Sequence, residues 1–303
     1  MKRKTLLFLV LANLFWAGNY VYGKYVVTEV SPIQMTFVRW LIALCFLFPM
    51  AHFIERPKWN RLWKHWKVLG AMSLLGVIGY NMLLYQALMY TSPLNASLVN
   101  ALNPAVIVIF SVILLKEKLS KLNILGFAIS LFGVLLILTR GQLLELFRIQ
   151  YNMGDLLMLA AILVWTFYSI IGRTIPQIPP IAATAMTVMI GLLLMLPFAS
   201  SAWVPLGEIS SSAKTGILYM GLFPTVGSFL LWNLAVRDIG PSRCGIFLNL
   251  ITVFTAITSI ILGEQITLIQ LFGGISVFTG VYLTSKQIKT GESLKESREA
   301  EAL

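Results

Sequence analysis

Long apolar runs, repeated along almost the whole chain, constrain this sequence more than any other feature. The runs cover residues 5–23, 32–53, 68–90, 94–115, 122–138, 156–172, 181–198, 215–236, 244–262 and 268–285. A helix needs roughly 20 apolar residues to cross a bilayer. With 58% hydrophobic and 12% charged residues, the chain is also far more apolar than a soluble domain. The sequence predicts an all-α integral membrane protein with ten transmembrane helices, in contact with membrane lipid.

The positive charges predict how these helices are oriented. If the N-terminus is cytoplasmic, 18 of the 23 Lys and Arg residues fall on the cytoplasmic side. This skew is the one that the positive-inside rule expects, so we predict that both termini are cytoplasmic. The apolar run after Met-Lys-Arg-Lys contains Asn13 and Asn19 and no small-residue cleavage site, so we interpret it as a retained first span. The net charge of +11 then reports topology, and we expect no nucleic-acid partner.

The two halves of the chain resemble each other. An offset of 147 to 149 residues aligns Trp16 with Trp165, Gly23 with Gly172, Pro32 with Pro180, Gly79 with Gly227, Pro93 with Pro241, Glu117 with Glu264, Gly126 with Gly273 and Gly133 with Gly280. Each half holds five predicted spans, and an odd number makes matched elements point in opposite directions. The sequence therefore predicts two inverted five-helix repeats, an architecture in which rocking of one half exposes a midplane site to each side in turn.

A family resemblance lies in the fifth and tenth runs. The segment 116–134, KEKLSKLNILGFAISLFGV, resembles the end of an EamA repeat, and the segment 263–281, GEQITLIQLFGGISVFTGV, looks like the same module. With Trp16 in a Phe-Trp-Ala-Gly-Asn context and Asn103-Pro104 in the fourth run, the chain is similar over nearly its whole length to ten-span drug/metabolite transporters. Ile251-Thr252 replaces Asn103-Pro104 in the second half, so the role of that proline is not shared by both halves.

The resemblance implies a secondary transporter of a bacterial inner membrane that exports small metabolites, amino acids or drugs. It also implies a division into a first EamA repeat at 1–139, an external linker at 140–154, a second repeat at 155–285 and a charged cytoplasmic tail at 286–303. Proton coupling is an expectation from the family. Substrate identity, direction of transport and oligomeric state are left open by the sequence.

Polar and aromatic groups inside the runs are candidates for the substrate pathway, because such groups tend to face the interior of a helix bundle. The candidates are Trp16, Asn19, Tyr20, Arg39, Asn81, Tyr85, Asn100, Asn103, Trp165, Tyr168, Ser169, Trp232, Asn233, Asn249 and Thr252. Hydrogen bonds that only hold helices together use the same residue types, which is the competing interpretation.

Arg39 is the one charge placed well inside a run, about seven residues from the predicted outer end of the second span. It is interpreted either as a packing residue that snorkels or pairs with a neighbour, or as a positive locus for a carboxylate substrate. The glycines at 126, 133, 273 and 280 are spaced by seven within each half, which favours close contact between helices.

The absence of certain motifs narrows the energy sources that could drive transport. The sequence has no G-x-x-x-x-G-K-[ST] loop for ATP and no acidic residue deep inside a run, so Glu117, Asp155 and Glu264 near the run ends are the titratable candidates. Pairing or solvation at helix ends is their competing interpretation. Two cysteines and two histidines without metal-ligand spacing predict no metal site and no cofactor. The alternatives are an uncoupled facilitator of small solutes and, less favoured, a polytopic membrane enzyme.

Overall fold

The computed structural model describes residues 3–115, 121–145, 151–174, 178–199, 203–205, 207–239 and 246–286, and these ranges contain helices, turns and loops but no β-strand. The helices are α1 (Arg3–Val26), α2 (Pro32–Met50), η1 (Ala51–Glu55), α3 (Trp59–Trp63), α4 (Trp66–Met72), η2 (Ser73–Gly79), α5 (Tyr80–Tyr90), α6 (Pro93–Asn100), α7 (Asn103–Leu115), α8 (Lys121–Leu138), η3 (Leu143–Glu145), α9 (Met153–Thr174), α10 (Pro180–Ala199), α11 (Ser211–Met220), η4 (Gly221–Gly227), α12 (Ser228–Ile239), η5 (Ile246–Leu248), α14 (Asn249–Ile261) and α15 (Leu268–Lys286). The segments η1, η2 and η4 are π-helical, and η3 and η5 are 3₁₀ turns.

Within the described ranges, six helices are long and apolar enough to cross a membrane. They are Arg3–Val26, Pro32–Glu55, Trp66–Tyr90, Met153–Ile171, Pro180–Phe198 and Ser211–Trp232. Shorter apolar helices at Ile124–Leu138, Asn249–Ile261 and Leu268–Gly280 fall in three more of the apolar runs. Phe53 and Ile261 are more than two-thirds exposed, as suits side chains that contact lipid instead of water. The structure thus has the make-up of a membrane protein, while the count of ten spans stays a prediction.

Three helices begin with a serine N-cap. Serine hydroxyls at residues 31, 92 and 210 accept hydrogen bonds from backbone N–H groups three residues later, at the N-termini of α2, α6 and α11. In α2 and α6 a proline follows the serine, where its missing N–H costs nothing and its fixed φ favours the helix. Ser-Pro therefore ends the preceding loop and starts the helix at both positions.

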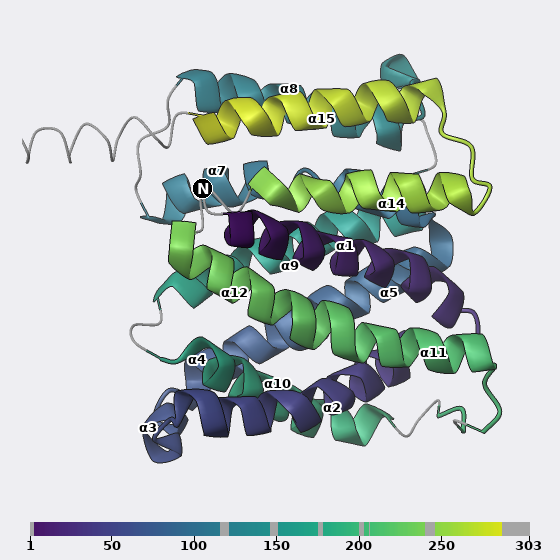
Figure 1. Ribbon diagram of the computed structural model, residues 1–303. Helices are drawn as coiled ribbons and strands as arrows, with labels where there is room; N and C mark the ends of the chain where they lie inside the picture. Colours follow the sequence, from purple (N-terminus) through teal and green to yellow (C-terminus); the bar gives the residue numbers. More distant parts are fainter. Residues whose placement is uncertain are drawn as a thin grey trace, which may run out of the picture.

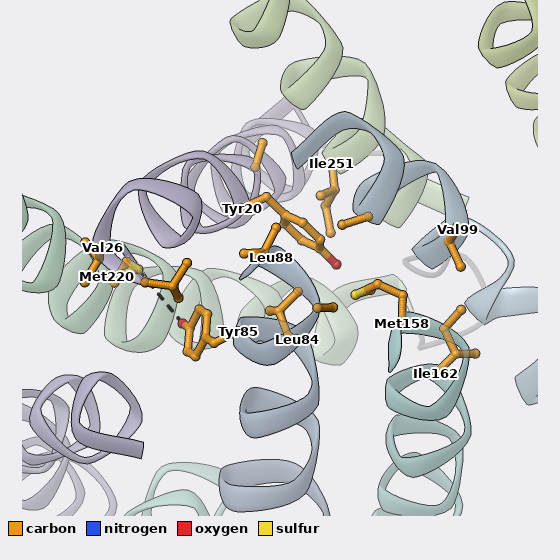
Figure 2. Packing of buried hydrophobic residues seen from close by; sticks show 14 of the residues in the cluster. Tyr20, Val26, Leu84, Tyr85, Leu88, Val99, Met158, Ile162, Met220 and Ile251 are labelled. Carbon is orange, nitrogen blue, oxygen red and sulfur yellow. Dashed lines mark hydrogen bonds between the residues drawn. The ribbon is translucent and has the colours of Figure 1, made fainter. Parts of the chain in front are cut away.

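The helices form layers (Figure 1). The helices α8 and α15 lie side by side at one edge of the molecule, and α2 and α10 lie together at the opposite edge. Between these edges, α1, α5, α9, α12 and α14 surround the interior. Figure 2 shows the central packing, in which Tyr85 and Leu84 from α5 lie between Met220 of α11 and Met158 of α9. This packing holds together helices from both halves of the chain.

The contact between α8 and α15 depends on small residues. A Cβ atom added at Gly133 would lie 2.5 Å from the carbonyl oxygen of Gly273, and one added at Gly280 would meet the carbonyl oxygen of Gly126. Ser130 adds a hydrogen bond from its hydroxyl to the carbonyl of Val277, at 3.2 Å. The backbones of the two helices approach too closely for any larger side chain, as the glycine spacing predicts.

Three of the long helices contain a π-helical segment: η1 ends one of them, and η2 and η4 lie within the other two. In a π-turn the usual i to i−4 hydrogen bonds are disturbed, and side chains can bond to the carbonyls that are released. Asn81 donates its amide to the carbonyls of Gly76 and Val77, at 2.9 and 3.0 Å. Thr225 donates its hydroxyl to the carbonyl of Met220 at 2.7 Å. Both η2 and η4 are therefore stabilised by polar side chains at or near their C-terminal ends.

The predicted fourth span, 94–115, is not one continuous α-helix. The helix α6 ends at Asn100, a turn follows at Ala101 and Leu102, and α7 begins at Asn103. Pro104 explains the interruption, because proline has no N–H for the carbonyl of Asn100 and its ring would collide with that carbonyl. The ninth run is also irregular, since the 3₁₀ turn η5 comes directly before α14.

Candidate functional site

The most unusual residue of the interior is Arg39 on α2, which is only 3% exposed. Burial of a guanidinium is costly unless its donors are satisfied, so its surroundings define the site. Nη1 lies 3.1 Å from the Oδ1 atoms of both Asn19 and Asn81 and also donates to the hydroxyl of Tyr85. Nε and Nη2 donate to Oγ1 of Thr225 at 3.2 and 2.7 Å.

The hydrogen-bond partners of Arg39 come from three other elements of the fold. Asn19 projects from α1, Asn81 and Tyr85 from α5, and Thr225 from η4. Tyr85 also donates its hydroxyl to Oδ1 of Asn19, at 2.8 Å. The guanidinium therefore connects helices that are distant in the sequence, and two of its partners also stabilise the π-helical segments.

No carboxylate in the described part of the chain forms a salt bridge with Arg39, and every hydrogen-bond acceptor around it is a neutral oxygen. The rings of Trp40 and Tyr85 add cation–π contacts, at 5.2 and 5.6 Å from the guanidinium carbon to the ring centroids. The bonds to described residues use one hydrogen of Nη2 and leave the other without an acceptor. Among the described residues, the buried positive charge thus keeps one donor without an acceptor and has no counter-charge.

Arg39 lies in the wall of a cavity of about 70 Å³. The lining residues are Trp16, Asn19, Tyr20, Arg39, Trp40, Gly76, Tyr80, Asn81, Asn100, Asn103, Trp165, Phe229, Leu248 and Ile251. They combine aromatic rings, amides and one charge, and they come from both halves of the chain. Such a mixture, apolar walls with few polar groups, is typical of small-molecule sites.

Aromatic rings frame the cavity on two sides. Trp16 donates its indole N–H to the carbonyl of Pro224 at 3.0 Å and packs against Trp232, with the ring centroids 5.5 Å apart. Trp165 lies between the rings of Tyr80 and Tyr168, with centroid distances of 4.9 Å to each. Each tryptophan is therefore held in position by at least one ring that does not line the cavity, Trp232 for Trp16 and Tyr168 for Trp165.

A larger hollow, of about 670 Å³, lies at the start of α10, next to η1. Its lining is almost entirely apolar, and its carboxylate, that of Glu55, accepts hydrogen bonds from the backbone N–H groups of Ile181 and Ala182 at 3.1 and 2.8 Å. The carboxylate thus has the role of a helix cap. Because its lining includes a charged side chain and several amides, the smaller cavity at Arg39 is the better candidate for a functional site.

The structure brings many of the predicted pathway residues together. Eight of them line the cavity: Trp16, Asn19, Tyr20, Arg39, Asn81, Asn100, Asn103 and Trp165. Others lie behind the lining: Tyr85 is fully buried beneath Arg39, Trp232 packs on Trp16 and Tyr168 packs on Trp165. The role of all these residues in transport stays a prediction.

The remaining predicted residues make contacts of other kinds. Ser169 donates to the carbonyl of Trp165 in its own helix, and Thr252 donates to the carbonyl of Ser97 on α6, at 2.7 and 2.9 Å. Asn249 is half-buried at the start of α14, and its Oδ1 has no hydrogen-bond partner. The side chain of Asn233 lies outside the described residues.

The three predicted coupling residues do not line the cavity. Asp155 is buried in the first turn of α9, where its carboxylate accepts a hydrogen bond from Thr91 at 2.8 Å. Glu264 is half-buried in the loop between α14 and α15, and Glu117 lies outside the described residues. No group of three or more metal-binding side chains is found among the described residues.

Sequence reasoning missed Trp40, Tyr80 and Thr225. Trp40 and Tyr80 directly follow or precede residues that were singled out, but a neighbour in sequence points to another face of a regular helix. Thr225 carried a usable signal, because it follows Pro224 inside an apolar run, where proline marks a helical irregularity. Polar groups next to such an irregularity are natural partners for a buried charge.

Comparisons with known proteins give a consistent result. The profile of the EamA-like transporter family matches residues 3–139 and 152–286. An uncharacterized transporter of Bacillus subtilis, YyaM, is 30% identical over 91% of this chain and 92% of that protein. An uncharacterized transporter of Archaeoglobus fulgidus is 27% identical over 94% of this chain and 98% of its own length. A solved crystal structure shares the fold, with a TM-score of 0.64 at 19% identity over 93% of this chain and 96% of that chain.

Proposed function

Because the chain belongs to the EamA-like transporter family, we propose that it is a secondary transporter in which the cavity at Arg39 binds a small solute during alternating access. The observation that carries the proposal is the buried guanidinium of Arg39, which lines the cavity and has only neutral hydrogen-bond partners among the described residues. Polar groups of this kind inside a membrane protein mark substrate pathways. We infer that the transported solute binds in this cavity.

The charge of Arg39 favours a solute with a carboxylate. Guanidinium and carboxylate form short, charge-assisted hydrogen bonds that match in geometry, and these bonds are stronger away from water. The neutral oxygens of Asn19, Asn81 and Thr225 hold the guanidinium in place without neutralising it. A carboxylate of the solute would supply the missing negative charge, and the rings of Trp16 and Trp165 would contact an apolar part.

The architecture that we propose for this transporter is ten spans in two inverted repeats, with both termini in the cytoplasm of a bacterial cell. The spacing of the irregular segments supports the repeat, since η2 starts at Ser73 and η4 at Gly221, an offset within the range that aligns the two halves of the sequence. The two separate matches to one family profile also support it. In an inverted repeat, equivalent irregularities would let either half move against the other.

We further propose export as the direction and proton antiport as the energy source. The sequence offers no phosphate-binding loop for ATP, so a gradient must drive uphill movement. Asp155 is the titratable group whose position best suits coupling, because its buried carboxylate contacts Thr91 at the C-terminal end of α5, the helix that carries Asn81 and Tyr85. A change in its protonation could alter that contact.

The test is flux in proteoliposomes that contain the purified protein and an imposed pH gradient. A panel of small carboxylic acids and their uncharged amides is offered on one side. We expect the acids, but not the amides, to accumulate on the acidic side, because antiport exchanges each acid for protons that leave that side. Weak acids that cross the lipid without the protein would collect on the alkaline side instead. Flux of acids that only follows the concentration gradient would remove the proton coupling and leave a facilitator. Equal flux of acids and amides would overturn the assignment of Arg39 as the solute site.

A further inference from the structure

The hollow at the start of α10 differs in make-up from the cavity at Arg39, and the two share no lining residue. The carboxylate of Glu55 in its wall accepts hydrogen bonds from two N–H groups at the N-terminus of α10, where the helix dipole favours a negative charge. The other walls are formed by two prolines and by Ile54, Ile178, Ile181, Leu230 and Leu234. Apart from Glu55, the lining thus consists of apolar side chains.

This hollow opens on the surface that contacts lipid. Ile54 and Leu234 line it and are 65% and 41% exposed, and Phe53, which precedes Ile54 in the sequence, is 72% exposed. In a chain with helices long and apolar enough to cross a membrane, apolar side chains with this exposure face the acyl chains of the bilayer. The volume of about 670 Å³ falls within the range of about 300 to 1,000 Å³ that is usual for sites of organic ligands, so part of an acyl chain fits.

Tryptophans indicate that the hollow lies at the level of the lipid head groups. Trp59 and the lining residue Ile178 pack against the same buried apolar cluster, which contains Ile181 of the lining. Trp63 and Trp66, at the end of α3 and the start of α4, are about half exposed. Exposed tryptophan collects at the boundary between water and hydrocarbon, because its ring is apolar and its N–H is polar. A phospholipid with an acyl chain in the hollow would therefore have its head group near α3.

The part of the chain that follows Glu55 is strongly basic. Residues 56–67 contain no Asp or Glu and five cations, which are Arg56, Lys58, Arg61, Lys64 and Lys67. All five are exposed, and Arg56 and Lys58 are the nearest in sequence to the lining of the hollow. Figure 1 shows α3 and α4, which belong to this segment, at one end of the layer formed by α2 and α10. Lys and Arg at the surface of a bilayer attract anionic lipids.

An anionic phospholipid combines the two chemistries that this region offers. Its acyl chains suit the apolar lining, and its phosphate suits the cations, since arginine can bind a phosphate through two parallel hydrogen bonds. A zwitterionic phospholipid has the same chains, but its own cation offsets the charge of its phosphate. A soluble phosphate has no group for the apolar lining, and an apolar helix of a partner protein has no charge for the basic segment.

We propose that the hollow at the start of α10 binds an anionic glycerophospholipid, with an acyl chain against Ile54, Leu230 and Leu234 and the phosphate at Arg56 and Lys58. These lining residues come from η1, which continues α2, and from α12, and they meet the start of α10. A bound lipid would therefore hold three helices together at one end of the bundle. The site is independent of the proposed solute cavity, and neither assignment needs the other.

The experiment measures binding of the first lipid to the purified protein in detergent by native mass spectrometry. The probes are phosphatidylglycerol and phosphatidylcholine with identical acyl chains, each titrated separately. We expect the protein to bind phosphatidylglycerol about 10-fold more tightly, and the double substitution Arg56→Gln with Lys58→Gln to reduce this preference to about 2-fold or less. The control Lys214→Gln removes an exposed cation on α11, which contributes no residue to the hollow, and should keep the full preference.

A second pair of variants tests the apolar part of the site. Leu234→Trp places a large ring in the hollow, so we expect both lipids to bind about 10-fold more weakly with their ratio unchanged. The matched control is Leu218→Trp on α11, where the leucine is 52% exposed and does not line the hollow. This control should bind both lipids as the unmodified protein does. The preference is a ratio within one variant, so it does not depend on how much of the protein is folded.

Loss of the preference in the double variant, together with weaker binding of both lipids by Leu234→Trp, supports the proposal. An unchanged preference in the double variant, or an equal loss in Lys214→Gln, would overturn the assignment of the head group. Unchanged binding by Leu234→Trp would place the lipid outside the hollow and overturn the site itself. Displacement of bound phosphatidylglycerol by an equal concentration of glycerol phosphate would assign the cations to a soluble anion and contradict the lipid as occupant.

Discussion

The α8–α15 pair and the region around Arg39 use helices in opposite ways. In the pair, both helices are regular α-helices, and glycines allow backbone to approach backbone. Around Arg39, α5 continues from the π-helical η2, α12 continues from the π-helical η4, and α6 is interrupted after Asn100. Of these two regions, the one in which backbone packs on backbone has regular helices, and the one in which polar groups surround a cavity has irregular helices.

The difference has an energetic basis. A regular helix satisfies its own backbone, so two such helices can meet through apolar and small residues without a polar partner. A π-segment or a break releases carbonyls, and each must find a donor inside the bilayer. Asn81 and Thr225 supply those donors and also accept hydrogen bonds from Arg39. The irregular segments and the buried charge thus stabilise each other.

The largest effect is expected where packing leaves no space. Gly133→Leu would drive a side chain into the backbone of α15, whose Gly273 carbonyl lies 2.5 Å from the position of an added Cβ. Because backbone cannot move aside as a side chain can, we expect a loss of about 3 kcal/mol or more and little folded protein in the membrane. Abundance and thermal unfolding in detergent measure the effect.

The matched control for this substitution is Gly70 on α4, which has no neighbouring atom within 4 Å of an added Cβ. Gly70→Leu should leave abundance near the wild-type level, since leucine also favours helix over glycine by up to about 1 kcal/mol. Equal abundance of the two variants would show that the α8–α15 contact is looser than its geometry indicates, and the contrast between the two regions would fail.

The second largest effect is expected on transport when the positive charge of Arg39 is removed. Arg39→Gln removes the positive charge and keeps one amide donor for the oxygens of Asn19 and Asn81. We expect transport of carboxylates to fall by about 10- to 100-fold, which corresponds to the loss of a charge-assisted hydrogen bond, with neutral solutes spared. Initial rates in proteoliposomes, normalised to folded protein, provide the measurement. A uniform loss for acids and neutral solutes would assign Arg39 to packing.

Smaller effects are expected from replacing the two tryptophans that line the cavity. Replacing Trp16 or Trp165 with Ala should reduce transport by about 10-fold, because each ring lines the cavity and would contact the apolar part of the solute. Both rings also pack on Trp232 or Tyr168, so some loss of stability accompanies the change. Rates per folded molecule separate the two contributions. Stable variants of both tryptophans that transport at the unmodified rate would place these rings in the packing alone.

The smallest effect lies outside the spans, where Glu29 accepts hydrogen bonds from the N–H and hydroxyl of Ser210 at 2.7 and 2.6 Å. These bonds hold the pKa of Glu29 below its ordinary value. The stabilisation is therefore present above the ordinary pKa of a glutamate and is lost as the pH falls through the lowered value. Glu29→Gln should lower the melting temperature by about 1 °C at pH 7 and by less at pH 3, since the group is fully exposed. A difference that grows on acidification would contradict this sign.

Much of the polar site was predictable, because an arginine inside an apolar run must find partners among the few polar groups near its depth. The sequence indicated Asn19, Asn81 and Tyr85 as polar groups that face the interior of the bundle, and the structure places all three against Arg39. The glycine spacing likewise predicted close helix contacts, and the structure shows that α8 and α15 make one with each other.

The irregular segments could not be predicted in the same way. The π-helices η2 and η4 keep the hydropathy of their runs, so hydropathy does not mark where they begin or end, and Pro224 marks only that η4 is irregular. Thr225 becomes a partner of Arg39 only because η4 turns its hydroxyl toward α2. The hydrogen bond from Thr252 to the carbonyl of Ser97 depends on the register of α6 against α14, which packing sets across the two halves of the chain.

The central claim is that the cavity at Arg39 binds the transported solute, and protection of an introduced cysteine tests it most directly. In a background with both natural cysteines replaced by serine, Leu248→Cys places a thiol in the cavity lining, and Gly207→Cys places one in an exposed loop. A transported carboxylate at ten times its Kd should slow alkylation at position 248 by roughly 10-fold and leave position 207 unchanged. Equal alkylation rates at position 248 with and without solute, in a variant that still transports it, would contradict the account.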